Sequence, residues 1–366
     1  MTETPKPPRM PPPFLIPPAL RVRGAMAAAH RNMIPPMTRV LETGLAIIET
    51  KAAYAAVELG LADALHAQPL STTDLAVTVA ADEDALARLL RFLTALGYFK
   101  EGRDGRWSNT PMSEHLRVDH PDTVRDWIRF LGGPWNGEIW NDSLHSFQTG
   151  QSATTEALGA PFFDWLQAHP EEHETFDAAM AQTSQLVGPL FVANFDFGAY
   201  ERVCDVGGGT GAVLATVLDA APHLAGVLFD LPEVVARAPE LLEDRGVAGR
   251  VEIVSGSFFE TVPEGCDLYV LKSIVHDWDD ESCTRILRNI RERMAPGGRV
   301  VLLEMLMPTT KVEHPAKYAD LLMLVLTGSG RERTEAEFAA LARRAGLRLE
   351  TANNLMVCCV LELVAA

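Results

Sequence analysis

The sequence has no apolar run long enough to cross a bilayer and no segment with the apolar centre of a secretory signal peptide. Its apolar runs, such as residues 321–326, are much shorter than a membrane span. Cysteines are few and scattered: there are five, and none forms the C-x-x-C pair typical of zinc and redox sites. We therefore expect a cytoplasmic protein with no membrane partner, whose thiols are buried and reduced.

Positive charge is also scarce. There are 32 lysines and arginines against 49 aspartates and glutamates, so the net charge is −17 at pH 7. Proteins that bind nucleic acid present basic faces to the phosphate backbone, so we expect no nucleic-acid partner. The hydrophobic fraction of 47% and the charged fraction of 22% are those of a globular protein, and 366 residues suffice for two domains.

The N-terminal part of the chain is predicted to be helical after a proline-rich arm. Residues 1–18 contain eight prolines and almost no periodicity, which indicates a disordered or extended arm. Residues 19–118 have apolar residues at helical spacing, followed by a hairpin that is expected to turn at residues 102–105. Helix, turn, helix and hairpin together form a winged-helix pattern.

Two short helices of this pattern have candidate caps. Ser71 or Thr72 is expected to begin the first helix, and Asp82 or Asp84 the second. In a DNA-binding protein the second helix would enter the major groove, but here it carries no excess of basic residues. A packing or dimerisation role for this domain is therefore favoured over DNA recognition.

The rest of the chain divides into a helical segment and an α/β domain. Residues 119–195 are rich in Trp, Phe and Met; we expect a linker that also lines a substrate pocket, although aromatic residues more often belong to the core. Residues 196–366 alternate apolar strands with helices, which predicts a doubly wound, mostly parallel sheet. Ligands of such sheets bind at the carboxyl ends of the strands.

A glycine-rich turn follows the first of these strands, in the segment VCDVGGGTGAV. Asp205 precedes three alternating glycines, Gly207, Gly209 and Gly211, whereas dinucleotide-binding folds use G-x-G-x-x-G. An acid at this place would repel a pyrophosphate but can bind an ammonium group. S-adenosylmethionine has an ammonium group and no phosphate, so we predict this cofactor. An NAD(P)-dependent oxidoreductase is the less favoured alternative.

The next two strand ends supply further cofactor candidates. Asp230, followed by Leu231, ends the segment GVLFDLP and can accept hydrogen bonds from ribose hydroxyls, or it can cap the helix that begins at Pro232. Ser257 and Phe258 follow the third strand, where they can meet the edge and the face of an adenine. Phe258 is equally consistent with a place in the core.

The fourth strand ends in LKSIVHDWDD, which contains the candidate base. Histidine titrates near neutrality, so His276 can take a proton from a phenol. A base of this kind is usually oriented by a carboxylate, and Glu304 and Glu332 are the candidates. Alternatively, His276 and Asp277 only cap the following helix.

Acidic residues around the candidate base suggest a magnesium site as another interpretation. Asp277, Asp279, Asp280 and Glu304 offer the oxygen ligands that Mg²⁺ prefers. The segment DWDD is explained more simply as a helix N-terminus, where negative charge is favourable. We therefore predict no metal, and activity that survives EDTA.

The order and spacing of these motifs resemble those of a known family, the small-molecule O-methyltransferases of the plant caffeic-acid type and their bacterial natural-product relatives. The resemblance covers nearly the whole chain and rests on the winged helical module and on FDAAM, DVGGGTG, FDLP, VHDWDD, APGGRVVLLE and GRERTEAEF. It implies a doubly wound, Rossmann-like class I methyltransferase domain at residues 196–366, a winged-helix dimerisation domain at residues 19–118, and a homodimer. The implied reaction moves a methyl group to an aromatic hydroxyl of a small molecule, in antibiotic biosynthesis or similar secondary metabolism.

The resemblance also implies roles for individual residues. His276 matches the base, with Asp277 beside it, and the flanking acids match Glu304 and Glu332. The positions that match cofactor contacts are Ser184, Gly207, Asp230, Phe258 and Lys272. Phe176 and Met180 match substrate-binding positions, with Met180 near the transferred methyl group.

One position departs from the pattern of the family. Ser257 stands where the family usually has an aspartate that accepts from the adenine amino group. A neutral hydroxyl is a weaker acceptor, so this contact is expected to be weaker or rearranged. Two alternative functions stay open: a relative that works without the base or catalyses other chemistry on the same scaffold, and a winged-helix regulator that senses a ligand.

Overall fold

The computed structural model describes residues 16–311, 313–355 and 358–366. Most of the predicted proline-rich arm lies outside these ranges. Its last three residues belong instead to the first helix, α1, which spans Ile16–Met33.

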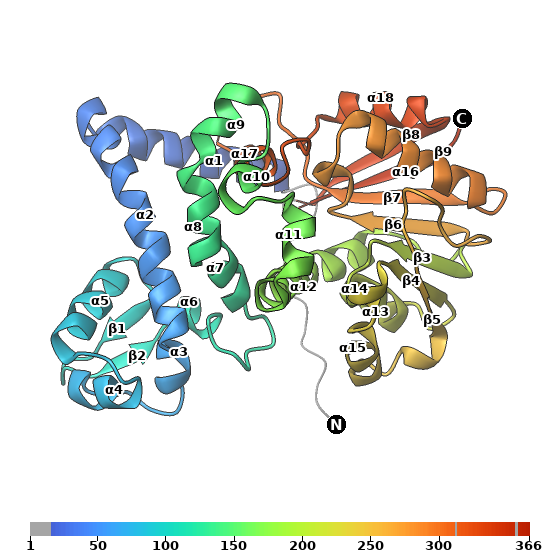
Figure 1. Ribbon diagram of the computed structural model, residues 1–366. Coiled ribbons are helices and arrows are strands. Elements are labelled where there is room, and N and C mark those ends of the chain that lie inside the picture. The colour runs from blue at the N-terminus through green and yellow to red at the C-terminus, as the bar shows by residue number, and fades with distance from the viewer. Residues whose placement is uncertain (1–15, 312, 356–357) are drawn as a thin grey trace. The chain divides into compact units, whose positions relative to one another are not determined.

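The described residues form two compact units, which are treated separately below (Figure 1). The first unit contains residues 27–138 and 169–183. The second contains residues 139–168 and 184–366, together with the described residues before residue 27.

The first unit is a helical module with a two-stranded wing. Its elements are α2 (Pro36–Glu58), α3 (Leu61–Ala64), α4 (Thr72–Thr78), α5 (Glu83–Ala95), β1 (Phe99–Glu101), β2 (Trp107–Asn109), α6 (Pro111–Glu114) and α7 (Arg125–Gly132). The Ser71 side chain caps α4 by accepting from Asp74 N at 3.1 Å, and Asp82 caps α5 by accepting from Ala85 N at 2.9 Å. β1 and β2 pair antiparallel, as the hairpin prediction required.

The core of the winged module forms because α5 is amphipathic. Leu86, Leu90 and Leu93 recur at helical spacing and are buried against α2 and the wing. Trp107 of β2 joins the same cluster and donates its indole N–H to the hydroxyl of Thr72 at 2.9 Å. The wing is therefore held to the helices by both apolar packing and a hydrogen bond.

The aromatic residues of the predicted linker segment are packed mainly with one another. Phe130 of α7 is 1% exposed, and its ring lies 5.5 Å, between centroids, from the rings of both Trp135 and Phe176. Trp127 lies 5.8 Å from the same ring. These contacts agree with a core role for the aromatic residues.

The N-terminal part of α2, residues 37–48, has an unusual surface. Six large apolar side chains there are at least half exposed: Met37, Val40, Leu41, Leu45, Ile47 and Ile48. A monomeric soluble protein seldom leaves so long an apolar stretch in water. This stretch is called the α2 apolar face below.

The second unit is built on a seven-stranded sheet. Its strands are β3 (Arg202–Val206), β4 (Ala225–Asp230), β5 (Val251–Ser255), β6 (Leu268–Lys272), β7 (Arg299–Glu304), β8 (Leu347–Asn354) and β9 (Cys359–Ala365). They lie in the order β5-β4-β3-β6-β7-β9-β8 (Figure 1). The first five in this order are parallel, and β9 runs antiparallel to both β7 and β8.

Helices accompany the strands, as the doubly wound prediction required. Those with residues in the second unit, besides α1, are α8 (Pro134–Asn141), α9 (Ser143–Thr149), α10 (Ala153–Leu158), α11 (Phe162–Ala168), α12 (Pro170–Asn194), α13 (Ala212–Ala220), α14 (Pro232–Val235), α15 (Ala238–Asp244), α16 (Asp280–Arg293), α17 (Pro315–Thr327) and α18 (Glu335–Arg344). Two 3₁₀ turns are η2 (Ala248–Arg250) and η3 (Val275–Asp277). α8 and α12 also have residues in the first unit.

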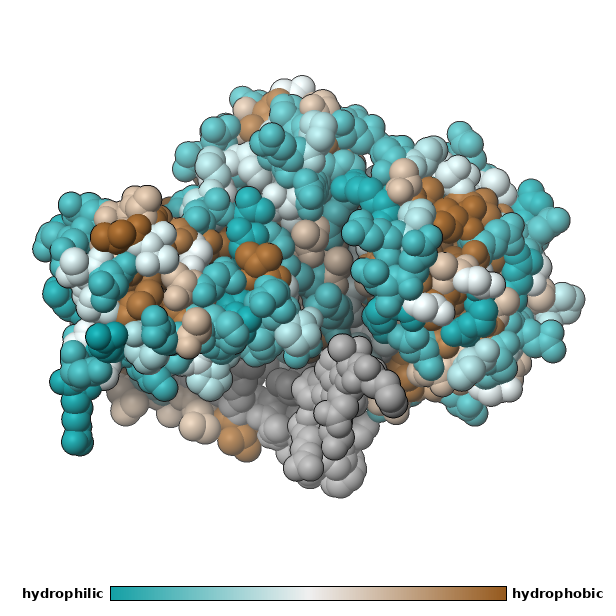
Figure 2. Space-filling model, turned by 90° about the horizontal axis from the view of Figure 1, so that it is seen from below, coloured by the Kyte–Doolittle hydropathy of each residue, from teal (hydrophilic) through white to brown (hydrophobic). Residues whose placement is uncertain are grey.

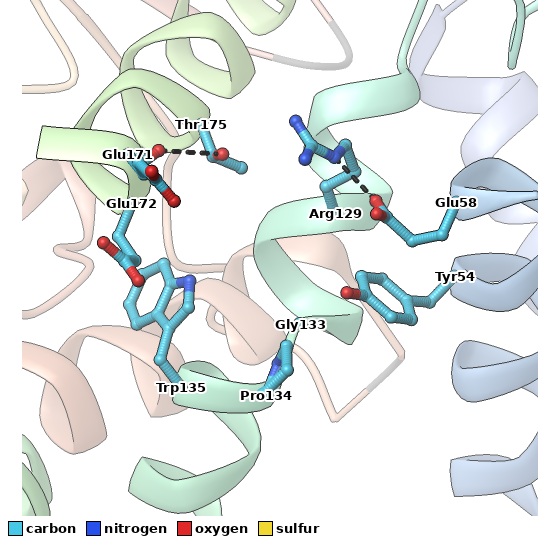
Figure 3. Close-up of a pocket in the computed structure, with 9 residues that line it drawn as sticks. All are labelled: Tyr54, Glu58, Arg129, Gly133, Pro134, Trp135, Glu171, Glu172 and Thr175. Carbon is cyan, nitrogen blue, oxygen red and sulfur yellow. Dashed lines mark hydrogen bonds and ion pairs between the residues drawn. The ribbon is translucent and has the colours of Figure 1, made fainter.

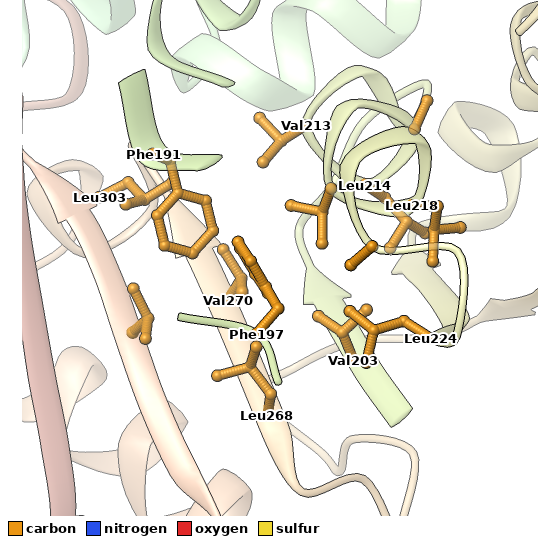
Figure 4. Close-up of a cluster of buried hydrophobic side chains, with 14 of the residues drawn as sticks. Phe191, Phe197, Val203, Val213, Leu214, Leu218, Leu224, Leu268, Val270 and Leu303 are labelled. Atoms are coloured by element: carbon orange, nitrogen blue, oxygen red, sulfur yellow. The ribbon is translucent and has the colours of Figure 1, made fainter. Parts of the chain in front are cut away.

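Both faces of the central strands β3, β4, β6 and β7 are buried, and successive residues of these strands point to opposite sides of the sheet. Val203 and Leu268 pack with Phe191, Phe197 and α13 in one cluster (Figure 4). Their neighbours in the strands pack with α16 and α18 in another cluster. Burial on both faces explains why these strands are nearly continuous apolar runs.

The strand order creates a topological switch point beside β3. The chain runs outward through β3, β4 and β5, then returns to add β6 on the other side of β3. At such a switch point the loops leave in opposite directions, and ligands bind between the carboxyl ends of the strands. The residues after β3 and β6 therefore form the candidate site.

The surface agrees with the acidic composition. On the face seen in Figure 2, hydrophilic residues predominate and hydrophobic ones gather in small patches. Over the described part of the chain, no helix is both long enough and apolar enough to cross a membrane.

Candidate active site

The glycine turn after β3 depends on three residues in the left-handed region. Gly207, Gly209 and Gly211 have φ of +68°, +61° and +86°. Other residues adopt this conformation at a cost of about 1–2 kcal/mol each. A Cβ atom at Gly207 would also lie 2.5 Å from Cδ1 of Ile274. The alternating spacing follows from this backbone, and Gly211 is the N-cap residue of α13.

Asp205 lies beneath the turn and is 2% exposed. A Cβ atom at Gly208 would stand 2.7 Å from the Asp205 carboxyl carbon. Burial raises the pKa of Asp205 to about 7, although a hydrogen bond from the Leu214 backbone acts in the opposite direction. This placement favours a role in shaping the turn. The predicted contact with an ammonium group stays a prediction.

Asp230, at the end of β4, ties the turn to the neighbouring strand. Its Oδ2 accepts from Gly209 N at 2.9 Å and its Oδ1 accepts from Leu231 N at 2.7 Å. The helix that follows, α14, is capped by Leu231 with no side-chain hydrogen bond. The helix-cap interpretation of Asp230 is therefore wrong, while its place at the strand ends suits a ribose acceptor.

Aromatic rings flank the turn. Phe258 would lie 3.6 Å from a Cβ atom at Gly207, and its ring packs 4.8 Å from Phe259 and 6.1 Å from Trp278. Trp278 was not among the residues predicted for the site, although it lies in the VHDWDD motif and follows β6. The hydroxyl of Ser257 accepts from Phe259 N at 3.3 Å, so it is engaged within its own turn.

β6 delivers Lys272 and then a strained residue. Burial lowers the pKa of Lys272 to about 8, against the raising effect of nearby carboxylates such as Glu304. Ser273 has φ +55° and donates its N–H to Leu303 O at 3.1 Å. A non-glycine residue in this region costs on the order of 1–3 kcal/mol, and such residues cluster at functional sites. The bend directs the chain into η3, which carries His276.

Three carboxylates from separate segments surround His276. Its Nδ1 lies 2.9 Å from Oε1 of Glu332 and 3.7 Å from Oε2 of Glu304. Its Nε2 lies 3.5 Å from Oδ1 of Asp277. An ionised carboxylate can only accept, so Nδ1 is the donor in the 2.9 Å contact. The structure thus brings together all four residues that were predicted to be catalytic.

Glu304 acts on both the ring and the backbone. It ends β7 and is 1% exposed. Its Oε1 accepts from Ile274 N at 3.0 Å and from Val275 N at 2.7 Å, and its Oε2 faces His276. Glu304 therefore fixes the start of η3 as well as contributing charge beside the imidazole.

The local charges make His276 an unusually strong base. Burial alone lowers its pKa, but the carboxylates of Glu304, Asp277 and Glu332 outweigh this effect and raise the pKa to about 10. Burial raises the pKa of Glu304 to about 7 and that of Asp277 to about 6, despite the positive charge of His276. The sequence-based expectation of an ionisation near neutrality is therefore corrected upward.

His276 and its two glutamates are also a group with the spacing of metal ligands, with donor atoms within 4.8 Å of one another. The hydrogen bond from Nδ1 explains the shortest of these distances without an ion. Two of the four acids of the magnesium alternative are engaged elsewhere: Asp279 caps α16, and Asp280 pairs with Arg333 at 2.8 Å. This agrees with the interpretation of DWDD as a helix N-terminus.

The predicted substrate residues lie in the first unit. Phe176 and Met180 are on α12, before the boundary between the units at residues 183 and 184. Ser184, a predicted cofactor contact, is buried just beyond that boundary. The roles of these three residues stay predictions.

The first unit contains a hollow of about 150 Å³ (Figure 3). Its lining residues are Tyr54, Glu58, Arg129, Gly133, Pro134, Trp135, Glu171, Glu172 and Thr175. The guanidinium of Arg129 pairs with Glu58 at 2.7 Å at one side of the hollow. Most of the lining comes from residues 119–195, the segment for which a pocket was predicted.

Comparison with protein families gives two matches. Residues 140–348 match an O-methyltransferase domain, and residues 41–119 match an O-methyltransferase dimerisation domain. The first match alone spans more than half of the chain.

Individual proteins give the same result. The chain is 40% identical over 306 residues to the mitomycin biosynthesis 6-O-methyltransferase of Streptomyces lavendulae, which is 82% of this chain and 86% of that protein. It is 37% identical over 326 residues to the 3-amino-4-hydroxybenzoate 4-O-methyltransferase of Streptomyces cremeus, 87% of each. It also matches the crystal structure of NcsB1, an O-methyltransferase from neocarzinostatin biosynthesis in complex with S-adenosylmethionine and 2-hydroxy-5-methyl naphthoic acid. That match has a TM-score of 0.73 and 33% identity over 87% of this chain and 96% of that chain.

One relative that matches over a similar length is named as a hydroxylase and not as a methyltransferase. The aclacinomycin 10-hydroxylase RdmB of Streptomyces purpurascens is 32% identical over 327 residues, 87% of this chain and 82% of that protein. Because one scaffold can host several reactions, the choice among them depends on the residues of the site.

Proposed function

We propose that this chain, which belongs to the small-molecule O-methyltransferase family and uses S-adenosylmethionine, methylates an aromatic hydroxyl with His276 as the general base. The observation that carries the proposal is the 2.9 Å contact between His276 Nδ1 and Glu332. It assigns the proton of the neutral imidazole to Nδ1, so Nε2 carries the lone pair that can accept a proton.

The acceptor class is inferred from the relatives. Their names include an aminohydroxybenzoate as substrate and a naphthoic acid as bound ligand, and two of the proteins are named for mitomycin or neocarzinostatin biosynthesis. We extend this class, small hydroxylated aromatic compounds of secondary metabolism, to the present chain.

The residues at the switch point fit the cofactor. The glycine turn lets a ligand approach the backbone closely, Asp230 offers a charged acceptor for ribose hydroxyls, and Phe258 with Trp278 offers ring faces for an adenine. Ser184, Leu231, Ser257 and Lys272 complete the set of proposed contacts. The cofactor supplies an activated methyl group on a sulfonium.

The proton of the acceptor passes to Nε2 of His276. A phenol has a pKa of about 10, like the tyrosine hydroxyl, and the pKa of His276 is also about 10. Proton transfer between groups of equal pKa is close to thermoneutral. The imidazolium that results is stabilised by Glu332 and Glu304 on the Nδ1 side and by Asp277 on the Nε2 side.

We further propose that the reaction is metal-independent. A base whose pKa matches that of its acceptor needs no Lewis acid to acidify the hydroxyl. Turnover should therefore survive exhaustive treatment with EDTA. A loss of activity that Mg²⁺ restores would contradict this part of the proposal.

A homodimer is the proposed assembly. The matched dimerisation domain, residues 41–119, includes part of the α2 apolar face, and a second copy of this face would remove its side chains from water. The absence of a nucleic-acid partner and a cytoplasmic location stay predictions from composition.

The leading test measures methyl transfer from labelled S-adenosylmethionine to 3-amino-4-hydroxybenzoate and to 2-hydroxy-5-methyl-naphthoic acid. We expect transfer to a hydroxyl of at least one, and a loss of about 10²–10⁴-fold in kcat for the His276→Ala variant. Binding of S-adenosylhomocysteine, measured by calorimetry, should stay nearly unchanged.

A more acidic acceptor provides the control for the role of the base. In 4-hydroxy-3-nitrobenzoate the electron-withdrawing nitro group lets the phenol ionise without a base, so the defect of His276→Ala should shrink. Full activity of His276→Ala on an ordinary phenol would support the alternative, a member of the scaffold that works by alignment alone.

A further inference from the structure

The backbone of the turn that carries His276 is held almost entirely by groups from elsewhere in the chain. Glu304 accepts from the N–H groups of Ile274 and Val275. On the opposite side, the carbonyls of Val275, His276 and Trp278 accept from one short segment, residues 330–333. We call this segment the strap.

Arg333 makes most of these contacts. It is 0% exposed, and its guanidinium donates to Val275 O and to Trp278 O, each at 2.8 Å. Its Nε donates to Oδ1 of Asp280, at the start of α16, at 2.9 Å. A guanidinium is a rigid planar fork, so these bonds fix the positions of the two carbonyls relative to each other.

Other strap residues contact the same turn. Arg331 N donates to His276 O at 2.7 Å. A Cβ atom at Gly330 would lie only 2.6 Å from His276 O, so a side chain there would push the turn away. Glu332, between Arg331 and Arg333, is anchored to α17 through its N–H, which donates to Oδ1 of Asp320 at 2.9 Å.

We infer that Arg333 is a positioning residue for the proposed reaction, which fixes η3 so that the His276 ring meets Glu332 and Glu304. Two consecutive residues have different roles. The Glu332 side chain contacts the imidazole, and the Arg333 side chain binds backbone carbonyls before and after His276 in the chain. Small displacements at such a site are costly for catalysis, since the reacting atoms must be aligned. The inference rests on the function proposed above for His276.

A purely structural role is the competing explanation. Arg333 also pairs with Asp280, so its loss could act only through the stability of α16. The Cys283 thiol also faces both carbonyls, Val275 O at 3.1 Å and Trp278 O at 3.4 Å, but a thiol is a weak donor. The two roles are distinguished by whether the ionisation of the His276 ring changes when Arg333 is replaced.

The test compares Arg333→Met with a matched control. Arg344→Met removes another guanidinium from the same Asp280, at 3.5 Å, without touching η3. Each protein, saturated with S-adenosylhomocysteine, carries ¹⁵N-labelled histidine, and the ring of His276 is titrated by NMR. The charged groups that face this ring are Asp277, Glu304 and Glu332, and Lys272 lies close to this cluster.

In the wild type and in Arg344→Met we expect His276 to ionise well above neutral pH. In Arg333→Met the ring loses its alignment with the carboxylates, and its ionisation should move toward neutral pH. An ionisation in folded Arg333→Met identical to that of the wild type would overturn the inference. If Arg333→Met does not fold, Arg333→Lys replaces it, because one ammonium cannot hold both carbonyls in the fork geometry.

Kinetics give a second readout on an acceptor that the wild type methylates. We expect kcat of Arg333→Met to fall on the order of 10²-fold with an ordinary phenol, with KM little changed, and to fall much less with 4-hydroxy-3-nitrobenzoate. An equal loss with both acceptors would indicate a structural role. If the loss of kcat in His276→Ala is the same for both acceptors, the proposed function fails. If that loss depends on the acceptor in His276→Ala but not in Arg333→Met, only the inference about Arg333 fails.

Discussion

Glu332 places one carboxylate oxygen 2.9 Å from the proposed base, and its charge has a consequence for pH dependence. Imidazole accepts a proton only when it is unprotonated, and the carboxylates raise the pKa of His276 to about 10. The wild-type kcat should therefore rise with pH from neutrality up to about pH 10. This behaviour differs from that of an exposed histidine, whose rise would end near pH 7.

The Glu332→Gln variant tests this assignment. The amide oxygen still accepts from Nδ1, but the negative charge is gone, so the pKa of His276 falls. The rise of kcat with pH should move down by about one to three pH units, with a lower plateau because the base is weaker. A pH profile measured with an ordinary phenol checks this; the same midpoint in both proteins would mean that another group controls the rate.

The Asp230 side chain is expected to support cofactor binding in two ways. Its carboxylate holds Gly209 N and is proposed to accept from ribose hydroxyls. Asp230→Ala removes both functions, so binding of S-adenosylhomocysteine should weaken about tenfold or more. Calorimetric titration measures it. Asp219→Ala, which removes an acid paired with Arg245 at the surface, is the control and should bind within about twofold of the wild type.

At the scale of elements, the glycine turn is coupled to the turn that carries the base. Gly207→Ala and Gly209→Ala each place a side chain in the left-handed region, at about 1–2 kcal/mol. A Cβ atom at Gly209 meets nothing within 4 Å, whereas one at Gly207 lies 2.5 Å from Ile274, next to η3. Gly207→Ala should therefore cost about 2–4 kcal/mol in all, through the added overpacking.

Thermal unfolding with and without S-adenosylhomocysteine measures both variants. The melting temperature should fall further for Gly207→Ala, and only this variant should also slow methyl transfer beyond its effect on cofactor binding. Equal losses in the two variants would show that contact with Ile274 is unimportant and that φ alone governs the turn.

At the scale of the whole molecule, the α2 apolar face predicts the state of assembly. The double substitution Leu41→Glu and Leu45→Glu would bury two charges of each chain in a dimer interface. Both leucines are exposed in the single chain, by 62% and 56%. The double variant should have the mass of one chain, 39.9 kDa, by light scattering, and the wild type twice that mass. Val77→Glu is the control, since Val77 is 79% exposed on α4 of the same module and lies outside this face. A wild type of 39.9 kDa at micromolar concentration would contradict the homodimer.

Local sequence signals predicted much of this protein. The cap residues Ser71 and Asp82, the hairpin and the strand–helix alternation all follow from preferences within a few residues of one another. The glycine spacing after β3 was predictive for the same reason, because left-handed φ angles are a local demand. Topology then follows from simple rules, so His276 could be placed at the ligand end of the sheet before its neighbours were known.

The remaining features depend on contacts between distant segments. The pKa of His276 is set by Glu304 and Glu332, which lie on later segments of the chain. The burial of Arg333 against η3 joins residues more than fifty positions apart, and its role is invisible in the composition of GRERTEAEF. The last two strands, β8 and β9, pair antiparallel with each other, and β9 also pairs with the distant strand β7. Chemistry at this site depends on charge and geometry summed over these contacts, and only the tertiary structure brings them together.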